Sequence, residues 1–311
     1  MITRRSLSRV LFTLPLVASA TSLPFSAASA DTQPEPGAQS LSGTVFGPAR
    51  GDQLHIMSFN VRFASDTPPN SWPERRPVLA ALLQREQPTV IGTQEGLYAQ
   101  LNDIQADLPN PYDSIGVGRQ GGSRGEFMHV FYDSRRLAPL EFDHFWLSDT
   151  PLLIGSATWG NTVVRMVTWV RFADMRTGRE FIFLNTHFDH RSEEARQRSA
   201  GLIRSTLEGF PAGTPLIVTG DFNTFPETSV SWQTLTEGGF LADTWLSADE
   251  QVTPYYGTFH GFNEPDPEAV RIDWILTSQG IRVPAAAINT FRRGSQWPSD
   301  HLPVQALVEL A

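Results

Sequence analysis

The stretch from Val218 to Asn223 constrains the fold and the chemistry of this chain more than any other. An apolar run over 215–218 predicts a buried strand, and Gly220 follows where that run ends. Asp221 and Asn223 stand two residues apart, so an extended backbone places both side chains on one side. One offers an acceptor and the other a donor, which suits the pair to holding a phosphate and a water. The alternative interpretation is a plain turn, because Asp, Asn and Gly all favour turns.

Five other apolar segments also carry polar residues at or near an end. They are Asn60 in the run 55–61, Gln94 and Glu95 after 89–93, 185–190 after 181–184, Asp273 within 271–276, and Asp300 with His301 before 302–304. Burying so many polar groups without partners would cost roughly 1–3 kcal/mol each. We therefore expect the six segments to converge on one another, on a metal ion or on water.

With these motifs in this order, the chain resembles the endonuclease/exonuclease/phosphatase superfamily, also called the DNase I-like fold, in its bacterial branch near the deadenylase-like members. The matching motifs lie at 58–62, 94–95, 186–189, 220–223, 272–275 and 299–301. They extend over almost all of the chain that follows residue 54. The resemblance implies an α+β fold: a four-layer α/β/β/α sandwich, in which helices flank two packed mixed β-sheets.

The hydrophobic pattern predicts more strands than helices. Strands are expected at 53–60, 89–93, 112–117, 127–132, 163–172, 181–186, 216–219, 269–277 and 302–310. Helices are expected at 72–87, 97–108, 193–207 and 227–237. Several strands per helix, of mixed lengths, independently indicate two packed sheets with outer helices.

The resemblance also implies a division of labour among the polar residues. Glu95, with Asn60 and Asp300 nearby, would bind a divalent cation. Oxygen and nitrogen donors without cysteine suit Mg²⁺, with Mn²⁺ as the alternative. Asp221 would orient or deprotonate the attacking water, and Asn223 would hold a phosphate oxygen.

Three histidines and an arginine complete the candidate site. His301, oriented by Asp273, would contact the phosphate as a cation, because a neighbouring carboxylate raises the pKa of a histidine. His187 would be the second imidazole, either on the phosphate or protonating the leaving group. Arg119 would clamp a distal phosphate, and His260, in a Gly-flanked aromatic loop, would face the substrate rather than the core.

The first 50 residues are expected to precede the catalytic domain, which we place at 51–311. Residues 1–30 combine twin arginines, an apolar stretch and small residues before Asp31, a pattern typical of a cleaved export signal of the twin-arginine or the Sec type. Residues 31–50, rich in Pro, Gly, Ser and Gln, predict a flexible linker. We therefore expect a periplasmic or extracellular protein.

Charge is the best guide to the substrate. The formal net charge is −9, and without the three arginines of residues 1–30 it is −12. The chain has no lysine, which excludes a Schiff-base or Walker lysine. Nucleic-acid binders normally carry a basic stripe, so nucleic acid is a disfavoured partner. After the signal, no apolar run approaches the roughly 20 residues of a membrane span, so stable membrane insertion is not expected.

These observations predict an exported, monomeric, Mg²⁺-dependent phosphoester hydrolase in which water attacks phosphorus. A small or headgroup-type phosphoester is the preferred substrate. The alternatives are a secreted nuclease, a lipid phosphodiesterase, and a non-catalytic binding module on the same scaffold.

Overall fold

The computed structural model describes residues 44–109 and 111–310. The predicted export signal, and residues 31–43 of the predicted linker, lie outside the described residues. Within the described part, no helix combines the length and the apolar character needed to cross a bilayer.

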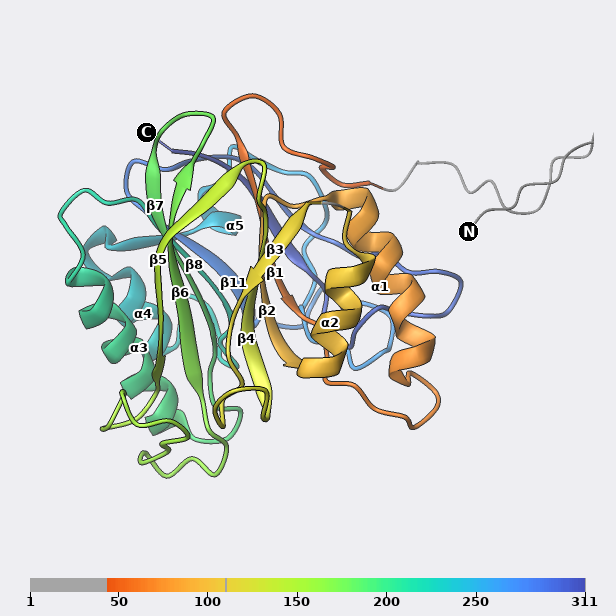
Figure 1. Cartoon of the computed structure of the whole chain (residues 1–311), viewed down its shortest axis with the longest axis horizontal. Coiled ribbons are helices and arrows are strands. Elements are labelled where there is room, and N and C mark those ends of the chain that lie inside the picture. Colours follow the sequence, from red (N-terminus) through yellow and green to blue (C-terminus); the bar gives the residue numbers. More distant parts are fainter. Residues whose placement is uncertain (1–43, 110, 311) are drawn as a thin grey trace, which may run out of the picture. The chain divides into compact units, whose positions relative to one another are not determined.

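Two β-sheets form the centre of the domain (Figure 1). One has seven strands in the order β10-β12-β13-β1-β2-β4-β3: β1 Leu54–Asn60, β2 Val90–Leu97, β3 Tyr112–Ile115, β4 Glu126–Asp133, β10 Glu250–Gln251, β12 Arg282–Ile288 and β13 Val304–Glu309. The other has six in the order β5-β6-β7-β8-β11-β9: β5 Leu137–Trp146, β6 Met166–Asp174, β7 Glu180–His187, β8 Leu216–Asp221, β9 Leu241–Asp243 and β11 Asp273–Ser278.

Helices cover the outer face of each sheet. They are α1 Trp72–Glu86, α2 Tyr98–Asp107, α3 Glu193–Glu208, α4 Val230–Thr236 and the short α5 Thr244–Ser247, with a 3₁₀ turn, η1, at Glu237–Gly239. Side chains of α1 and α2 pack on the seven-stranded sheet, and those of α3 and α4 pack on the six-stranded sheet. The layers therefore follow the order α/β/β/α, which confirms the predicted fold class.

The alternation of side chains along each strand builds three apolar layers. In β1, Ile56 packs between the sheets, whereas its neighbour Met57 packs under α1 and α2. In β7, Phe183 faces the space between the sheets and Leu184 faces the α3 layer. All four are fully buried. Each such side chain stabilises the fold by roughly 1.5–3 kcal/mol relative to an exposed one.

Two parallel strand pairs direct the chain toward one edge. β1 pairs in parallel with β2 after the α1 crossover, and β7 pairs in parallel with β8 after α3. The register sets Asn60 opposite Gln94 and His187 opposite Asp221. Because parallel neighbours end at the same edge, the polar residues at the ends of each pair lie together.

The structure differs from the predicted elements in several strands. β9 and β10 were not predicted, because they are only three and two residues long. β5 and β12 correspond to no predicted strand, because each contains a proline (Pro139 and Pro284) and β12 is rich in alanine, which disfavours strands. The strand predicted at 269–277 begins only at Asp273. Asp273 is thus the first residue of β11 rather than an interior one.

The domain also begins earlier than the predicted residue 51. The buried carboxylate of Glu86, at the end of α1, accepts hydrogen bonds from the backbone N–H groups of Val45, Phe46 and Gly47. These contacts make the end of the predicted linker part of the folded domain.

Candidate functional site

The candidate site lies where β1, β2, β7 and β8 end and β11 begins. β8 lies between β7 and β11, and Asp221 at its end is opposite His187 on one side and Asp273 on the other. The loop before β13 is fastened to the same edge, because Ser299 Oγ donates to the carbonyl oxygen of Asn60 at 2.6 Å. Five strand ends and one loop therefore bring the six predicted segments together.

The backbone near the site takes up unusual conformations. Arg62, Glu95 and Asn223 all have positive φ, at 52°, 66° and 50°. Glu95 lies in an irregularity of the β2–β4 pairing between Thr93 and Gly96, which redirects its side chain. Left-handed backbone costs about 1–2 kcal/mol at a residue with a Cβ atom. Such strain is retained where a side chain must point in one direction, as at functional sites.

One buried arginine holds the loop after β1 in place. Arg75, fully buried on α1, donates to the carbonyl oxygens of Val61, Arg62 and Phe63, and also to those of residues 70 and 298. Its guanidinium thus joins the loop after β1 to the chain just before Ser299.

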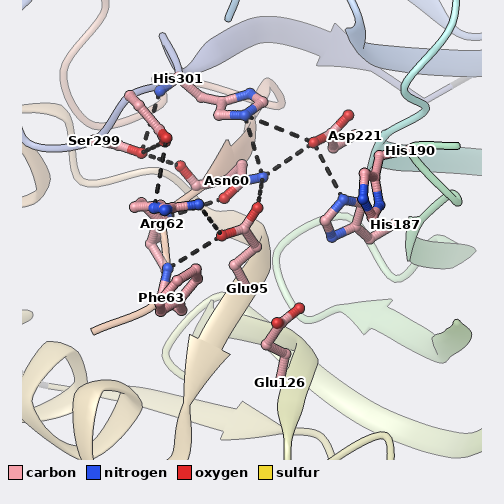
Figure 2. Close-up of polar contacts among 12 residues, drawn as sticks. Asn60, Arg62, Phe63, Glu95, Glu126, His187, His190, Asp221, Ser299 and His301 are labelled. Atoms are coloured by element: carbon pink, nitrogen blue, oxygen red, sulfur yellow. Dashed lines mark hydrogen bonds and ion pairs between the residues drawn. The ribbon is translucent and has the colours of Figure 1, made fainter. Parts of the chain in front are cut away.

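Asn60 connects the two carboxylates at the centre of the site (Figure 2). Its Nδ2 donates to Glu95 Oε1 and to Asp221 Oδ2, both at 3.0 Å. Glu95 also accepts a hydrogen bond from the Phe63 backbone at 3.2 Å. A strand-end amide therefore holds Glu95 and Asp221, which lie on different sheets, close to each other.

Asp221, His301 and Asp273 form a buried charged chain. His301 Nδ1 donates to Asp273 Oδ2 at 2.9 Å, and its Nε2 lies 3.8 Å from Asp221 Oδ2. Burial alone would lower the pKa of His301, but the charge of Asp273 and its hydrogen bond more than offset this and raise the pKa to about 10. Burial, reinforced by the charge of Asp273, raises the pKa of Asp221 to about 7. His301 is therefore an imidazolium near neutral pH.

The second imidazole has the opposite character. Burial, followed by the charge of Arg165, lowers the pKa of His187 well below its ordinary value. Its Nε2 lies 3.0 Å from Asn223 Nδ2 and 3.4 Å from Asp221 Oδ2. A neutral ring accepts the hydrogen bond that Asn223 donates, so His187 orients the amide while Asn223 N donates to Asp221 Oδ1 at 3.0 Å.

A cavity of about 440 Å³ opens over these residues. Seven of the ten predicted site residues line it: Glu95, Arg119, His187, Asp221, Asn223, Asp300 and His301. Asn60 and Asp273 lie behind the lining and hold its members through hydrogen bonds.

The carboxylates of Glu95 and Asp300 fit a hard cation. Both line the cavity, and each has an oxygen 3.6 Å from a nitrogen of Arg62, so both already face one positive group. Oxygen donors of this kind are the ligands that Mg²⁺ and Mn²⁺ prefer.

A second carboxylate group lies nearby and has different chemistry. Asp221, Asp273 and His301 place three ligand atoms within 4.8 Å of one another. However, His301 donates a proton to Asp273 and is protonated near neutral pH, and an imidazolium cannot ligate a metal. The oxygen donors on the Glu95 side therefore suit a cation better, and this group suits acid–base chemistry better.

The prediction that His260 faces the substrate is wrong. Both of its ring nitrogens lie near backbone carbonyls, those of Asn263 at 2.8 Å and Ser299 at 3.1 Å, and the ring packs on Trp297. The neighbouring Phe259, 53% exposed, lines the cavity instead. Because successive residues of an extended segment face opposite sides, the loop presents Phe259 rather than His260 to the cavity.

Arg119 lines the cavity, but its charge is already paired. Its Nη1 lies 2.7 Å from a carboxylate oxygen of Glu126, a cavity residue that the sequence did not single out. Arg165 and His190 also line the cavity and were not among the predicted site residues. Arg165 interrupts the apolar run 163–167, the same signal that identified Asn60 and Asp273, and could have been found in this way.

Comparison with known proteins places this geometry among related folds. Residues 57–301 match the model of the Endonuclease/Exonuclease/phosphatase family. An endonuclease/exonuclease/phosphatase from Bacteroides vulgatus is 33% identical, with a TM-score of 0.78, over 83% of this chain and 99% of that one. A mannosyl-6-phosphatase from Bacteroides thetaiotaomicron is 34% identical, with a TM-score of 0.76, over 82% and 99%.

A more distant likeness agrees in fold. The catalytic domain of human Nocturnin, solved with a bound sulfate anion, has a TM-score of 0.66 and 20% identity, over 84% of this chain and 94% of that one. The family match and the bacterial neighbours confirm the resemblance predicted from the motifs, and Nocturnin agrees with it in fold.

Proposed function

Because this chain belongs to the endonuclease/exonuclease/phosphatase family, whose members hydrolyse phosphoesters, we propose that it is an exported, Mg²⁺-dependent hydrolase of small phosphoesters. One observation carries the proposal. Asp221 Oδ2 lies 3.0 Å from Asn60 Nδ2, 3.4 Å from His187 Nε2 and 3.8 Å from His301 Nε2. A cavity-wall carboxylate that is held by an amide and flanked by two imidazoles is suited to orienting a water molecule.

The side chains divide the chemistry of hydrolysis among them. Asp221, whose pKa is raised to about 7, accepts the proton of the attacking water. The imidazolium of His301 stabilises the negative charge that develops on the phosphoryl oxygens, and Asp273 keeps it protonated. Asn223, oriented by His187, donates to a phosphate oxygen. Catalysis of this kind is mostly positioning and electrostatics.

The cation belongs to the other side of the same centre. Glu95 would hold it, with Asp300 and Asn60 beside it. When bound, Mg²⁺ supplies positive charge that neutralises the phosphate and favours departure of the leaving oxygen. Mn²⁺ would satisfy the same oxygen donors.

Size and charge support a small substrate. The cavity of about 440 Å³ has the volume of a small-molecule site. The net charge of −12 after residue 30 works against long polyanions. The similar Bacteroides thetaiotaomicron protein is a phosphatase of a sugar phosphate, which agrees with this size class. The proposal that the protein is exported rests on the pattern of residues 1–30. The proposal that it is a monomer rests on the sequence alone.

A substrate screen tests the proposal. The protein with Mg²⁺ is assayed against mannose 6-phosphate, glucose 6-phosphate, inositol phosphates, bis-nitrophenyl phosphate, sphingomyelin, RNA and plasmid DNA. We expect the fastest turnover on the small water-soluble esters and a loss of at least about 1,000-fold in Asp221→Asn. Faster turnover of DNA or RNA, falling steeply with salt, would establish a nuclease instead. Full activity in Asp221→Asn would remove this residue from the mechanism.

A further inference from the structure

Arg165 is the one cavity residue whose charge the described side chains leave unpaired at close range. It is only 4% exposed, yet it lines the cavity. Within the described residues, its Nε and Nη1 have no hydrogen-bond acceptor, and no carboxylate lies within ion-pair distance. Its Nη2 has a single partner, His190 Nδ1, at 3.3 Å. Burying a charged group without acceptors is costly, and a sequence retains such a group where a ligand supplies the acceptors.

The other arginines of the cavity are engaged differently. Arg119 is paired with Glu126 at 2.7 Å, and Arg62 faces Glu95 and Asp300. Glu126 is also the carboxylate whose charge acts most on Arg165, but its ion pair is with Arg119. Among the described residues, Arg165 is therefore the cavity guanidinium whose unpartnered donors are buried, whereas the Arg62 side chain is partly exposed to solvent.

The position of Arg165 separates it from the cation side of the centre. Its partner His190 lies beside His187 on one side of Asp221, whereas Glu95 and Arg62 lie on the other (Figure 2). Arg165 and Asp221 nevertheless line the same cavity, so one small molecule can reach both. A group bound by Arg165 is thus close to the reacting phosphate and distinct from it.

We propose that Arg165 forms an anion subsite, and that the preferred substrate carries a second negative group, a phosphate or a carboxylate, in addition to the phosphoester that is cleaved. This inference rests on the proposed function for its substrate and deepens it. The fork of donors on a guanidinium matches the oxygens of either anion. The role that the sequence predicts for Arg119, clamping a distal phosphate, is performed by Arg165.

Kinetics with a matched pair of esters test the subsite. Glucose 1,6-bisphosphate and glucose 6-phosphate differ only in the second anion. We expect Arg165→Met to lower kcat/KM for the bisphosphate by about tenfold or more, through KM, and to change the monophosphate by less than about threefold. Arg165→Lys should retain part of the preference. The control, Arg171→Met on β6, the strand that begins directly after Arg165, removes an exposed arginine paired with Glu180 and should alter the kinetics of neither substrate.

Two kinetic outcomes would overturn the inference. An equal loss on both substrates would mean that Arg165 contacts the cleaved phosphate. No loss on either would mean that it binds no substrate anion.

A second measurement does not depend on turnover. Inorganic phosphate is titrated into protein kept in EDTA, and the rise in melting temperature is followed. We expect the phosphate affinity of Arg165→Met to be about tenfold lower than that of the wild type. We also expect Arg165→Met to melt at a higher temperature without phosphate, because it removes a buried charge that lacks acceptors. A variant that binds phosphate as well as the wild type, or that melts several degrees lower, contradicts the subsite. If none of the small esters in the screen is cleaved but the phosphate result holds, the proposed function fails and the subsite stands.

Discussion

Replacing Asp273 by Asn tests how the site keeps His301 charged. The substitution keeps the size of the side chain and removes one negative charge. Asp273 is fully buried, and its Oδ2 accepts the Nδ1 proton of His301 at 2.9 Å. With the carboxylate gone, burial is left as the dominant influence on the ring, and burial lowers the pKa of a histidine.

The magnitude follows from the pKa of His301. The site raises it from an ordinary 6.5 to about 10. A tenfold change in proton affinity corresponds to 1.36 kcal/mol, so the preference for the imidazolium is on the order of 5 kcal/mol. If Asp273→Asn returns the pKa to near 6.5 or below, fewer than about one in ten rings is charged at pH 8.

The assay is the pH dependence of kcat/KM for the wild type and the variant. At pH 8 we expect the variant to be slower by at least about tenfold. The ratio of wild-type to variant activity should shrink toward pH 6, where the variant ring regains its proton. The ratio cancels the titration of groups that both proteins share. A ratio that is constant between pH 6 and 8 would refute the reasoning.

The stability that the Asp273–His301 pair contributes should also decrease as the pH rises. A raised histidine pKa contributes stability that is fully present below 6.5 and is lost as the pH rises through about 10. The difference in melting temperature between wild type and Asp273→Asn should therefore be largest near pH 6 and smaller near pH 9. The control is Asp243→Asn on the adjacent strand β9, which breaks a buried pair with Arg271 at 2.7 Å. It should lower the melting temperature without altering the pH dependence of activity.

Three further perturbations test other parts of the site and the fold. Protein freed of metal with a chelator should be stabilised by about 2.7 kcal/mol when Mg²⁺ is added at about 100 times its dissociation constant, which raises the melting temperature. Glu95→Gln should lose this rise in melting temperature. An equal rise in both proteins would remove Glu95 from the cation site. Arg75→Lys keeps the charge but loses the fixed donors that bind the carbonyl oxygens of the loop after β1, so both the melting temperature and kcat should fall. Wild-type values for both would show that the loop does not need these hydrogen bonds. Glu86→Ala removes the acceptor of three N–H groups at residues 45–47, so backbone hydrogen exchange there should rise above that of the β1 amides, and unchanged protection would contradict the contact.

The sequence predicted the convergence of the site because its signal is local. A polar residue at the end of an apolar run, as at Asn60, Glu95 and Asp221, needs a partner wherever the chain folds. Parallel strand pairs then bring such ends to one edge. A local pattern also predicted the bounds of α1, α2, α3 and α4 to within a few residues, because apolar residues on one face of a helix repeat every three to four positions.

What the sequence could not supply depends on contacts between distant segments. Nothing local indicates that Arg75 is buried among backbone carbonyls or that Arg165 lacks a close partner, because arginine is usually exposed. The sequence does not tell which residue of the loop faces the cavity, because the bridge between Phe259 and His301 fixes the phase of the loop. The positive φ of Glu95 likewise follows from the irregular β2–β4 pairing, which no pattern in the sequence announces.

Hydrolysis in ¹⁸O-enriched water is the most direct test of a water attacking phosphorus beside Asp221. The wild-type protein hydrolyses the best substrate from the screen in the presence of Mg²⁺ under single-turnover conditions. The products are separated, and their masses are measured by mass spectrometry. We expect one ¹⁸O atom in each phosphate that is released and none in the alcohol. Label in the alcohol, or unlabelled phosphate, would contradict this account.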